Sequence, residues 1–280
     1  MNKDYKSVGI LAMSYVGATL LSLILGSHPR CRSVGHCYMF FNPYRNKSSF
    51  KKLALRENMC RYCDALNKPC SLNKLKDIGG DPIKAYEIIA KELLEKGEDI
   101  IIDSSSMRKW FNLSMPDLRI TLFRHPVSLA SSHVKARTKK MGRARAIGYS
   151  CSRFIGMYKG AYGILIEYEN IVEETSQLKA LFSLIGIDFS PNYLKYWEYN
   201  NHIVGGNEGA LINVIKHYKP EELDAFVKHV SRGQSEYEKY YKMAEGNFPG
   251  NINILTKEEE DLVMARCGSL YNQLKMNELR

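Results

Sequence analysis

Short apolar runs alternate with helical patterns along the first two thirds of the chain, and this alternation constrains the fold more than any other feature. Four runs have the length and composition of buried strands. These runs are residues 8–13, 99–103, 118–123 and 164–168. Strands that alternate with helices indicate a mostly parallel sheet covered on both faces. We therefore expect an α/β protein with a P-loop-like three-layer fold, in which a central mostly parallel sheet is flanked by helices.

The length of 280 residues suits one large α/β domain, and we expect residues 1–280 to form a single domain. Residues 31–80 are polar, rich in cysteine and without clear periodicity, which predicts an insertion or a substrate-facing segment. Residues 211–280 are expected to be helical additions, with a capping box at Thr256-x-x-Glu259. Helices are also predicted from apolar spacing between the strands. They cover residues 18–25, 83–93, 126 onward, 147–158 and 170–185.

The positive charge is concentrated in one segment. The chain has 40 Lys and Arg against 30 Asp and Glu, a net charge of +10. Residues 118–166 contain ten basic residues and no acidic one, so the rest of the chain is balanced. This distribution indicates a local anion site. The densest part, residues 135–145, is either a solvated helix face or a surface that attracts an anionic donor or acceptor. It contains no interleaved aromatic residues, so we expect no nucleic-acid partner.

Residues 7–29 contain no charged side chain, and a signal or membrane anchor is the alternative interpretation of this stretch. Small and polar residues interrupt its apolar character, and a turn-like cluster lies in its middle. These features favour a segment that folds into the sheet. We therefore predict a cytoplasmic protein without a stable membrane span. The sequence leaves the oligomeric state open.

The cysteines suggest a metal site. Five of the seven lie between residues 31 and 70, and Cys60-x-x-Cys63 followed by Cys70 has partial metal-ligand spacing. A fourth ligand could come from Cys31, His36 or Cys37. Bound structural zinc is one interpretation, and free thiols or a disulfide are the others.

Two groups of residues point to an anionic ligand. The first is a strand, a turn and a helix start, where the N–H groups of Gly17, Ala18, Thr19 and Leu20 would face a phosphate or sulfate. This loop lacks the Lys-Ser/Thr pair of nucleoside-triphosphatases, which disfavours ATP chemistry with Mg²⁺ and a nucleotide kinase. The second is Arg124 at a strand end with Ser132 eight residues later, which can converge on one phosphate.

Taken together, these motifs resemble the sulfotransferase family, which uses 3′-phosphoadenosine-5′-phosphosulfate (PAPS) as donor. Ser14-Tyr15-Val16-Gly17-Ala18-Thr19-Leu20 is similar to the family's 5′-phosphosulfate loop, and Arg124 and Ser132 match its 3′-phosphate pair. Residues 103–105, 168–170 and 202–207 resemble further landmarks, so the likeness covers about residues 7–210. The resemblance implies that residues 15–20, Arg124, Ser132 and Tyr168 bind the nucleotide, although Tyr168 could equally serve packing.

The resemblance also implies the reaction. A sulfuryl group would move from PAPS to a hydroxyl or amine by in-line displacement, leaving adenosine 3′,5′-bisphosphate. His36 occupies the position of a general base in some relatives, although a surface histidine or metal ligand is an alternative. The family places a lysine after residues 103–105, where this chain has Ser106. Arg108, or Lys109 from the same loop, is a candidate for that cation, and a solvated loop residue is the alternative for Arg108.

The chain departs from the family pattern at Tyr15, where a basic residue is usual. A catalytically silent nucleotide-binding or scaffold protein is therefore one rival function, and a basic phosphate-polymer binder is another. The acceptor is left open among a carbohydrate, a lipid, a small metabolite and a peptide tyrosine, because variable segments build acceptor pockets.

Overall fold

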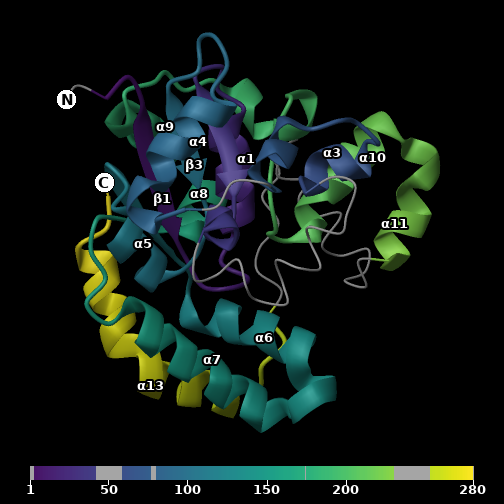
Figure 1. Cartoon of the computed structure of the whole chain (residues 1–280). Helices are drawn as coiled ribbons and strands as arrows, with labels where there is room; N and C mark the ends of the chain where they lie inside the picture. The colour runs from purple at the N-terminus through teal and green to yellow at the C-terminus, as the bar shows by residue number, and fades with distance from the viewer. Residues whose placement is uncertain (1–2, 42–58, 77–79, 174, 230–252, 280) are drawn as a thin grey trace.

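The computed structural model describes residues 3–41, 59–76, 80–173, 175–229 and 253–279. A five-stranded parallel sheet in the order β2-β3-β1-β4-β5 forms its centre. The strands are β1 (Lys6–Leu11), β2 (Cys31–Gly35), β3 (Ile100–Asp103), β4 (Leu118–Phe123) and β5 (Ile164–Glu167). Helices cover the sheet, so the predicted α/β architecture is confirmed (Figure 1).

All four predicted strands are present, but the sequence did not indicate β2. The segment 31–80 was expected to be an insertion or a substrate-facing segment, whereas its first five residues form an edge strand paired with β3. Its sequence, CRSVG, lacks an apolar run, yet every residue in it is buried. Arg32 is tolerated there because its guanidinium pairs with Glu95 and Glu98 at 2.9 Å each. The strand thus depends on a tertiary ion pair that local patterning does not reveal.

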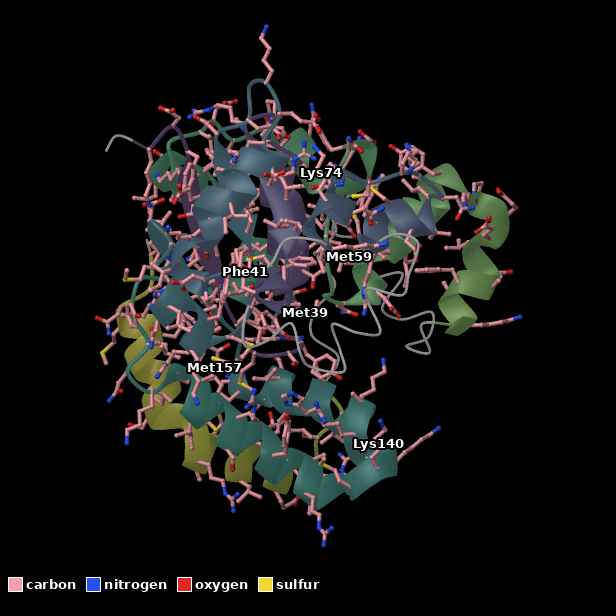
Figure 2. The ribbon with its side chains drawn as sticks, viewed as in Figure 1. Met39, Phe41, Met59, Lys74, Lys140 and Met157 are labelled. Carbon is pink, nitrogen blue, oxygen red and sulfur yellow. The ribbon has the colours of Figure 1, made fainter. Side chains whose placement is uncertain are left out.

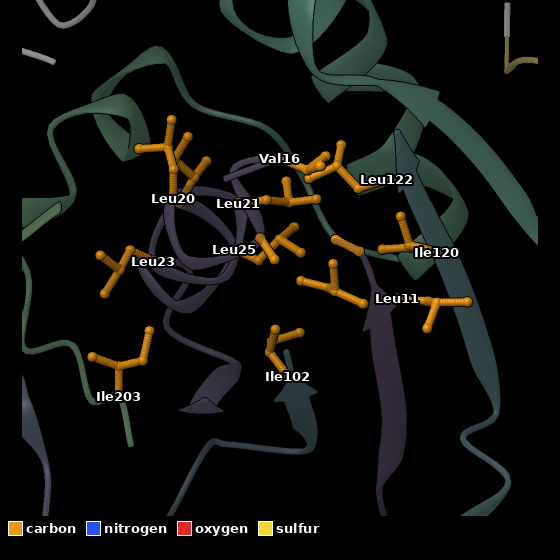
Figure 3. Close-up of a cluster of buried hydrophobic side chains, with 14 of the residues drawn as sticks. Leu11, Val16, Leu20, Leu21, Leu23, Leu25, Ile102, Ile120, Leu122 and Ile203 are labelled. Carbon is orange, nitrogen blue, oxygen red and sulfur yellow. The ribbon is translucent and has the colours of Figure 1, made fainter. Parts of the chain in front are cut away.

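Helix α1 (Ala18–Gly26) packs against β2 and β3 and lies in the core. Leu21 and Leu25 of this helix belong to the same buried hydrophobic cluster as Leu11 and Ile102 of the strand region (Figure 3). Residues 7–29 therefore contribute β1 and α1 to the buried centre of the fold, as expected. In the part of the chain that the structure describes, no helix combines the length and the hydropathy needed to cross a bilayer.

The remaining helices connect the strands or follow them. They are α3 (Arg61–Ala65), α4 (Ala85–Leu93), α5 (Arg108–Ser114), α8 (Tyr168–Glu173), α9 (Ser176–Ile185), α10 (Ile212–Tyr218) and α11 (Leu223–His229). Short 3₁₀ helices occupy Cys37–Phe40, Ser71–Lys76, Pro82–Lys84, Pro191–Leu194, Tyr196–Glu198, Glu208–Leu211 and Pro220–Glu222. The helix predicted over 170–185 is divided into α8 and α9.

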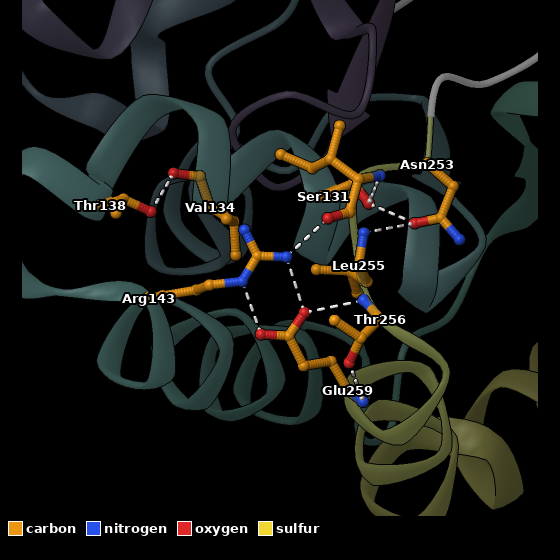
Figure 4. Close-up of polar contacts among 9 residues, drawn as sticks. Ser131, Val134, Thr138, Arg143, Asn253, Leu255, Thr256 and Glu259 are labelled. Carbon is orange, nitrogen blue, oxygen red and sulfur yellow. Dashed lines mark hydrogen bonds and ion pairs between the residues drawn. The ribbon is translucent and has the colours of Figure 1, made fainter.

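Two long helices, α6 (Pro126–Met141) and α7 (Arg143–Tyr158), turn back on each other at Gly142, and α13 (Lys257–Met276) packs against both (Figure 1). The guanidinium of Arg143 donates to both carboxylate oxygens of Glu259, at 2.6 and 2.7 Å (Figure 4). The predicted capping box is confirmed, since Thr256 and Glu259 bond each other's backbone N–H groups.

The end of the chain returns to the sheet at β5. The N–H of Leu279 donates to the carbonyl of Leu165, and the N–H of Glu167 donates to the carboxylate of Glu278. Lys275 bridges the carboxylates of Glu167 and Glu278, at 2.7 Å each. The helical C-terminal part is therefore integrated into the same body as the sheet.

Candidate anion-binding site

The predicted nucleotide residues meet at the carboxyl ends of β1, β4 and β5. In the sheet, β2 and β3 lie on one side of β1, whereas β4 and β5 lie on the other side. Chain connections therefore diverge between β1 and β4, and open parallel sheets bind ligands in the crevice formed at such a point. The loop after β1, Arg124 after β4 and Tyr168 after β5 all lie at this edge.

The start of α1 is suited to an anion. Its N-cap residue, Gly17, has φ 105° and makes no side-chain cap, and the first turn contains no acidic residue. The first-turn N–H groups of a helix have no intrahelical acceptor, and the helix dipole adds positive potential there. Only glycine fits at residue 17, because a Cβ would overlap the Tyr168 ring and the backbone is left-handed.

Arg124 connects the elements around this helix start. Its Nη1 donates to the carbonyl of Tyr15 at 2.9 Å and to the Oγ of Ser132 at 3.2 Å. Its Nε pairs with Glu169 at 3.4 Å, and its guanidinium lies 5.0 Å from the centre of the Tyr168 ring. The structure therefore brings the predicted pair of Arg124 and Ser132 together beside the loop after β1. We call residues 15–20 with Arg124 and Ser132 the anion site.

The other loop residues contribute in different ways. The side chains of Val16 and Leu20 are buried in the core, so only their main-chain groups can reach a ligand (Figure 3). Tyr15 has φ 71°, and its ring contacts the His133 ring edge-to-face at 5.1 Å. Thr19 accepts a hydrogen bond from the N–H of Asn207 at 2.9 Å, so the 202–207 segment lies against the first turn of α1.

His133 lies beside Tyr15 and responds to the positive charge of this region, and no sequence pattern marked it as a site residue. It is buried, and its Nδ1 bonds Ser150 at 2.8 Å. Burial, and to a smaller extent the positive charges of Arg137, Arg153 and Arg124, lowers the pKa of His133 to about 4. Three arginines from the segment without acidic residues thus act on one buried group beside Tyr15. This agrees with the concentration of positive charge expected near an anion site.

His36 follows β2 and lies next to the 202–207 segment. Its N–H donates to the carbonyl of Val204 at 2.7 Å, and a Cβ on Gly205 would come within 2.8 Å of its ring. A Cβ on the next residue, Gly206, would come within 2.7 Å of the hydroxyl oxygen of Thr19. Burial, and to a smaller extent the charge of Arg61, lowers the pKa of His36 to about 4. His36 is therefore neutral at pH 7 and close to the anion site.

Arg108 is held elsewhere. Its guanidinium donates to the carbonyls of Met157 and Lys159 at the end of α7, at 2.5 and 3.1 Å. Within the described residues, none of its hydrogen bonds reaches the loop after β1. Its catalytic role stays a prediction.

The loop after β3 is anchored by Asp103. This buried carboxylate accepts hydrogen bonds from Tyr86 at 2.9 Å and from the Trp110 indole at 2.6 Å, and it also bonds the N–H of Ser105 at 2.8 Å. Burial raises the pKa of Asp103 above its ordinary value, against the lowering effect of these donors. The residue fixes the loop at the carboxyl end of β3, beside β1.

The basic run 135–145 spans the end of α6 and the start of α7. Lys140 points outward at the far end of this helix pair (Figure 2). Arg137 lies over the Tyr149 ring, and Arg143 is paired with Glu259. Part of the run therefore has a structural role.

Three predicted metal ligands also converge. Cys60, Cys63 and Cys70 form a buried group with His202, and the four ligand atoms lie within 4.8 Å of one another. The expected fourth ligands were wrong: Cys37 bonds Ser105 instead, and neither Cys31 nor His36 belongs to the group. His202 follows Cys70 by 132 residues, so spacing along the chain gave no sign of it.

Known proteins resemble this chain in fold and not detectably in sequence. No protein-family profile matches it, and no curated protein does. The sulfotransferase domain from the curacin biosynthetic pathway superposes with a TM-score of 0.51 at 17% identity, over 89% of this chain and 100% of that chain. A sulfotransferase domain from the Synechococcus PCC 7002 olefin synthase gives a TM-score of 0.49 at 17% identity, over 87% and 95%. The chain thus has a sulfotransferase-like α/β fold.

Proposed function

We propose that the protein is a PAPS-dependent sulfotransferase, which moves a sulfuryl group to a hydroxyl or amine of an acceptor. The observation that carries this proposal is the position of Arg124, whose Nη1 lies within hydrogen-bond distance of both Ser132 and the loop before α1. A donor with one phosphate near Arg124 and a phosphosulfate at the N-terminus of α1 would match this arrangement. The sulfotransferase-like fold supports it.

The chemistry requires positioning and charge stabilisation. The acceptor oxygen or nitrogen forms a bond to sulfur while the bond from sulfur to the 5′-phosphate oxygen breaks, and the electron pair leaves with adenosine 3′,5′-bisphosphate. N–H groups of residues 17–20 would stabilise the negative charge that develops on the phosphosulfate. Because the reacting groups must lie in line, the rigid strand ends that carry the site favour the reaction.

In this proposal His36 accepts the proton from the acceptor and passes it to solvent. A pKa of about 4 keeps the imidazole unprotonated at neutral pH, so it is available as a base, although a weak one. The rate should then fall at low pH with a midpoint near 4 instead of near the ordinary value for histidine. A His36→Gln variant should lose this dependence and retain nucleotide binding.

Calorimetric titration of the purified full chain tests the donor site. Adenosine 3′,5′-bisphosphate should bind more tightly than adenosine 5′-monophosphate, and Arg124→Ala should weaken binding about 10- to 100-fold. Ser132→Ala should have a smaller effect, because it removes one neutral partner. Lys140→Ala is the matched control for loss of a positive charge, since Lys140 lies at the far end of α6. Equal binding of the two nucleotides by folded protein would overturn the proposal.

A catalytically silent binding protein is the second candidate. The observation that favours it is Tyr15, which stands where the resembling family has a basic residue and which packs against His133. Incubation with ³⁵S-labelled PAPS and panels of carbohydrates, lipids, small metabolites and tyrosine peptides separates the two. Labelled product supports the enzyme. Tight binding of adenosine 3′,5′-bisphosphate without transfer to any panel supports the silent protein, and Tyr15→Lys or Tyr15→Arg would then test whether a cation restores turnover.

A further inference from the structure

We propose that Cys60, Cys63, Cys70 and His202 bind a structural zinc ion, which fixes the 202–207 segment against the first turn of α1. These four residues, the thiol cluster, come from three separate parts of the chain. Cys60 and Cys63 lie at the start of α3, Cys70 directly precedes the 3₁₀ helix 71–76, and His202 belongs to the segment after Tyr196–Glu198. Figure 2 labels Met59, directly before Cys60, on the side of α1 where α3 lies.

The distances fit a tetrahedral ion. The Nδ1 of His202 lies 3.1 Å from the Sγ of Cys70, 3.4 Å from that of Cys63 and 4.0 Å from that of Cys60. Zinc–sulfur and zinc–nitrogen bonds of ordinary length place tetrahedral ligand atoms about 3.5–3.8 Å apart. The observed distances bracket this range. A set of three thiolates and one imidazole is typical of zinc, and four protein ligands make a closed structural site.

The backbone is arranged to hold a thiolate. The Sγ of Cys60 accepts hydrogen bonds from the N–H groups of Cys63 and Ile203, at 3.4 and 3.2 Å. Cys60 is also the N-cap residue of α3. A neutral thiol is a weak acceptor, so two converging donors indicate a charged sulfur. Zinc binds cysteine in this charged form.

The burial of the thiol cluster indicates that its four side chains share a ligand. All four residues are buried, and the Nε2 of His202 has no hydrogen-bond partner among the described residues. The Nδ1 of this buried imidazole faces the three sulfur atoms of the cluster. Burying the ring costs free energy unless another interaction offsets the loss of its contacts with water. A bond from Nδ1 to zinc provides that interaction.

Residues 202–207 connect the thiol cluster to the anion site. Ile203, next to His202, packs in the core close to Leu23 (Figure 3). Val204 makes bridges to both Gly35 and Cys60, and Asn207 donates to Thr19. Zinc would therefore fix one end of a six-residue segment whose other end contacts the first turn of α1. This role depends on contacts within the chain and holds whether or not the protein binds PAPS.

Metal analysis of the full chain tests the proposal. Protein expressed in zinc-supplemented medium and purified under a non-thiol reductant should contain one zinc ion per chain. Cys63→Ser and His202→Ala should lose most of it, whereas Cys31→Ser should retain it. Cys31 is the matched control because it is an equally buried free cysteine outside the thiol cluster. Substoichiometric zinc in folded wild-type protein, or equal loss in the Cys31 variant, would overturn the proposal.

Two measurements on wild-type protein keep the test decisive if a ligand variant fails to fold. Cobalt added to stripped protein should produce a thiolate-to-cobalt charge-transfer band and the visible bands of a tetrahedral ion, and spectra without them would refute the ligand set. Hydrogen exchange should be faster in stripped than in loaded protein at the amides of Val204 and Asn207. Equal exchange rates at these amides in loaded protein and in protein shown to have lost zinc would refute the proposal that zinc fixes residues 202–207 against α1.

Discussion

The anion site and the thiol cluster lie at opposite ends of one segment, residues 202–207, yet they are built in opposite ways. The anion site offers main-chain N–H groups and a guanidinium around a helix start with no side-chain cap of its own. In the thiol cluster four buried side chains face one another. The first arrangement suits a ligand that binds and leaves, and the second suits an ion that stays. Residues 202–207 would then connect a site for an exchangeable ligand with a site for a permanently bound ion.

The largest effect should come from the thiol cluster. Cys70→Ser removes one of the four proposed zinc ligands, and we expect the free energy of unfolding to fall by about 4 kcal/mol or more, as is usual when a structural metal is lost. Denaturant unfolding of zinc-loaded protein measures this. Cys31→Ser, the control, should cost clearly less. Equal losses from the two substitutions would show that the thiol cluster is ordinary buried packing.

The second largest effect should be a loss of stability at low pH, caused by His133 near the anion site. The pKa of His133 is about 4 in the folded state, below its ordinary 6.5, so the unfolded chain binds more protons between these values. The contribution of His133 to the free energy of unfolding is then fully present above pH 6.5. It decreases as the pH falls toward 4, by up to about 3 kcal/mol.

His133→Gln tests this, because an amide retains a hydrogen bond to Ser150 without titrating. Unfolding free energies of wild type and variant should converge as the pH falls from 6.5 to 4. Parallel pH profiles for the two proteins would contradict the assigned pKa shift. Zinc loss at low pH affects both proteins equally and leaves the difference intact.

A third substitution separates the two sites. Gly206→Ala places a methyl group close to the Thr19 hydroxyl on a left-handed backbone, which should displace the first turn of α1. We expect adenosine 3′,5′-bisphosphate binding to weaken about 10-fold, from a strain of about 1–2 kcal/mol, while zinc content stays at one per chain.

Gly160→Ala is the control for the backbone cost of Gly206→Ala. Gly160 also has positive φ, but its Cβ would meet no atom within 4 Å. Calorimetry and metal analysis on both variants give the answer. A loss of zinc from Gly206→Ala would mean that the segment cannot move at one end without disturbing the other.

The smallest effect should come from outside both sites. Thr256→Ala removes the cap of α13 and should lower the free energy of unfolding by about 1 kcal/mol. Thermal unfolding measures this loss. Zinc content and nucleotide affinity should be unchanged, and a change in either would show that α13 communicates with the sites.

The parts of the fold that follow from local patterning could be predicted. Apolar runs predicted β1, β3, β4 and β5 because a strand buried on both faces carries its signal in its own residues. The edge strand β2 could not be predicted, because Arg32 is neutralised by Glu95 and Glu98, more than 60 residues away. Its burial is a tertiary effect.

The candidate sites divide in the same way. Glycine at residue 17 and the spacing of Arg124 and Ser132 are local signals, and the structure brings these residues together. The pairing of His202 with three distant cysteines requires the chain to close a long loop, which no spacing rule anticipates. Arg108 illustrates the converse, since a suitable residue type in a suitable loop is held by the end of α7.

The contact between the chain's end and β5 has a consequence for handling the protein. β5 is an edge strand, and an uncovered edge is a template for pairing with other molecules. Leu279 and Glu278 occupy main-chain groups of Leu165 and Glu167 that would otherwise be free on that edge. Removal of Glu278 and Leu279 would uncover these main-chain groups, and we expect the exposed edge then to pair with other molecules. A tag placed before residue 3 would leave the contacts of Glu278 and Leu279 with β5 in place.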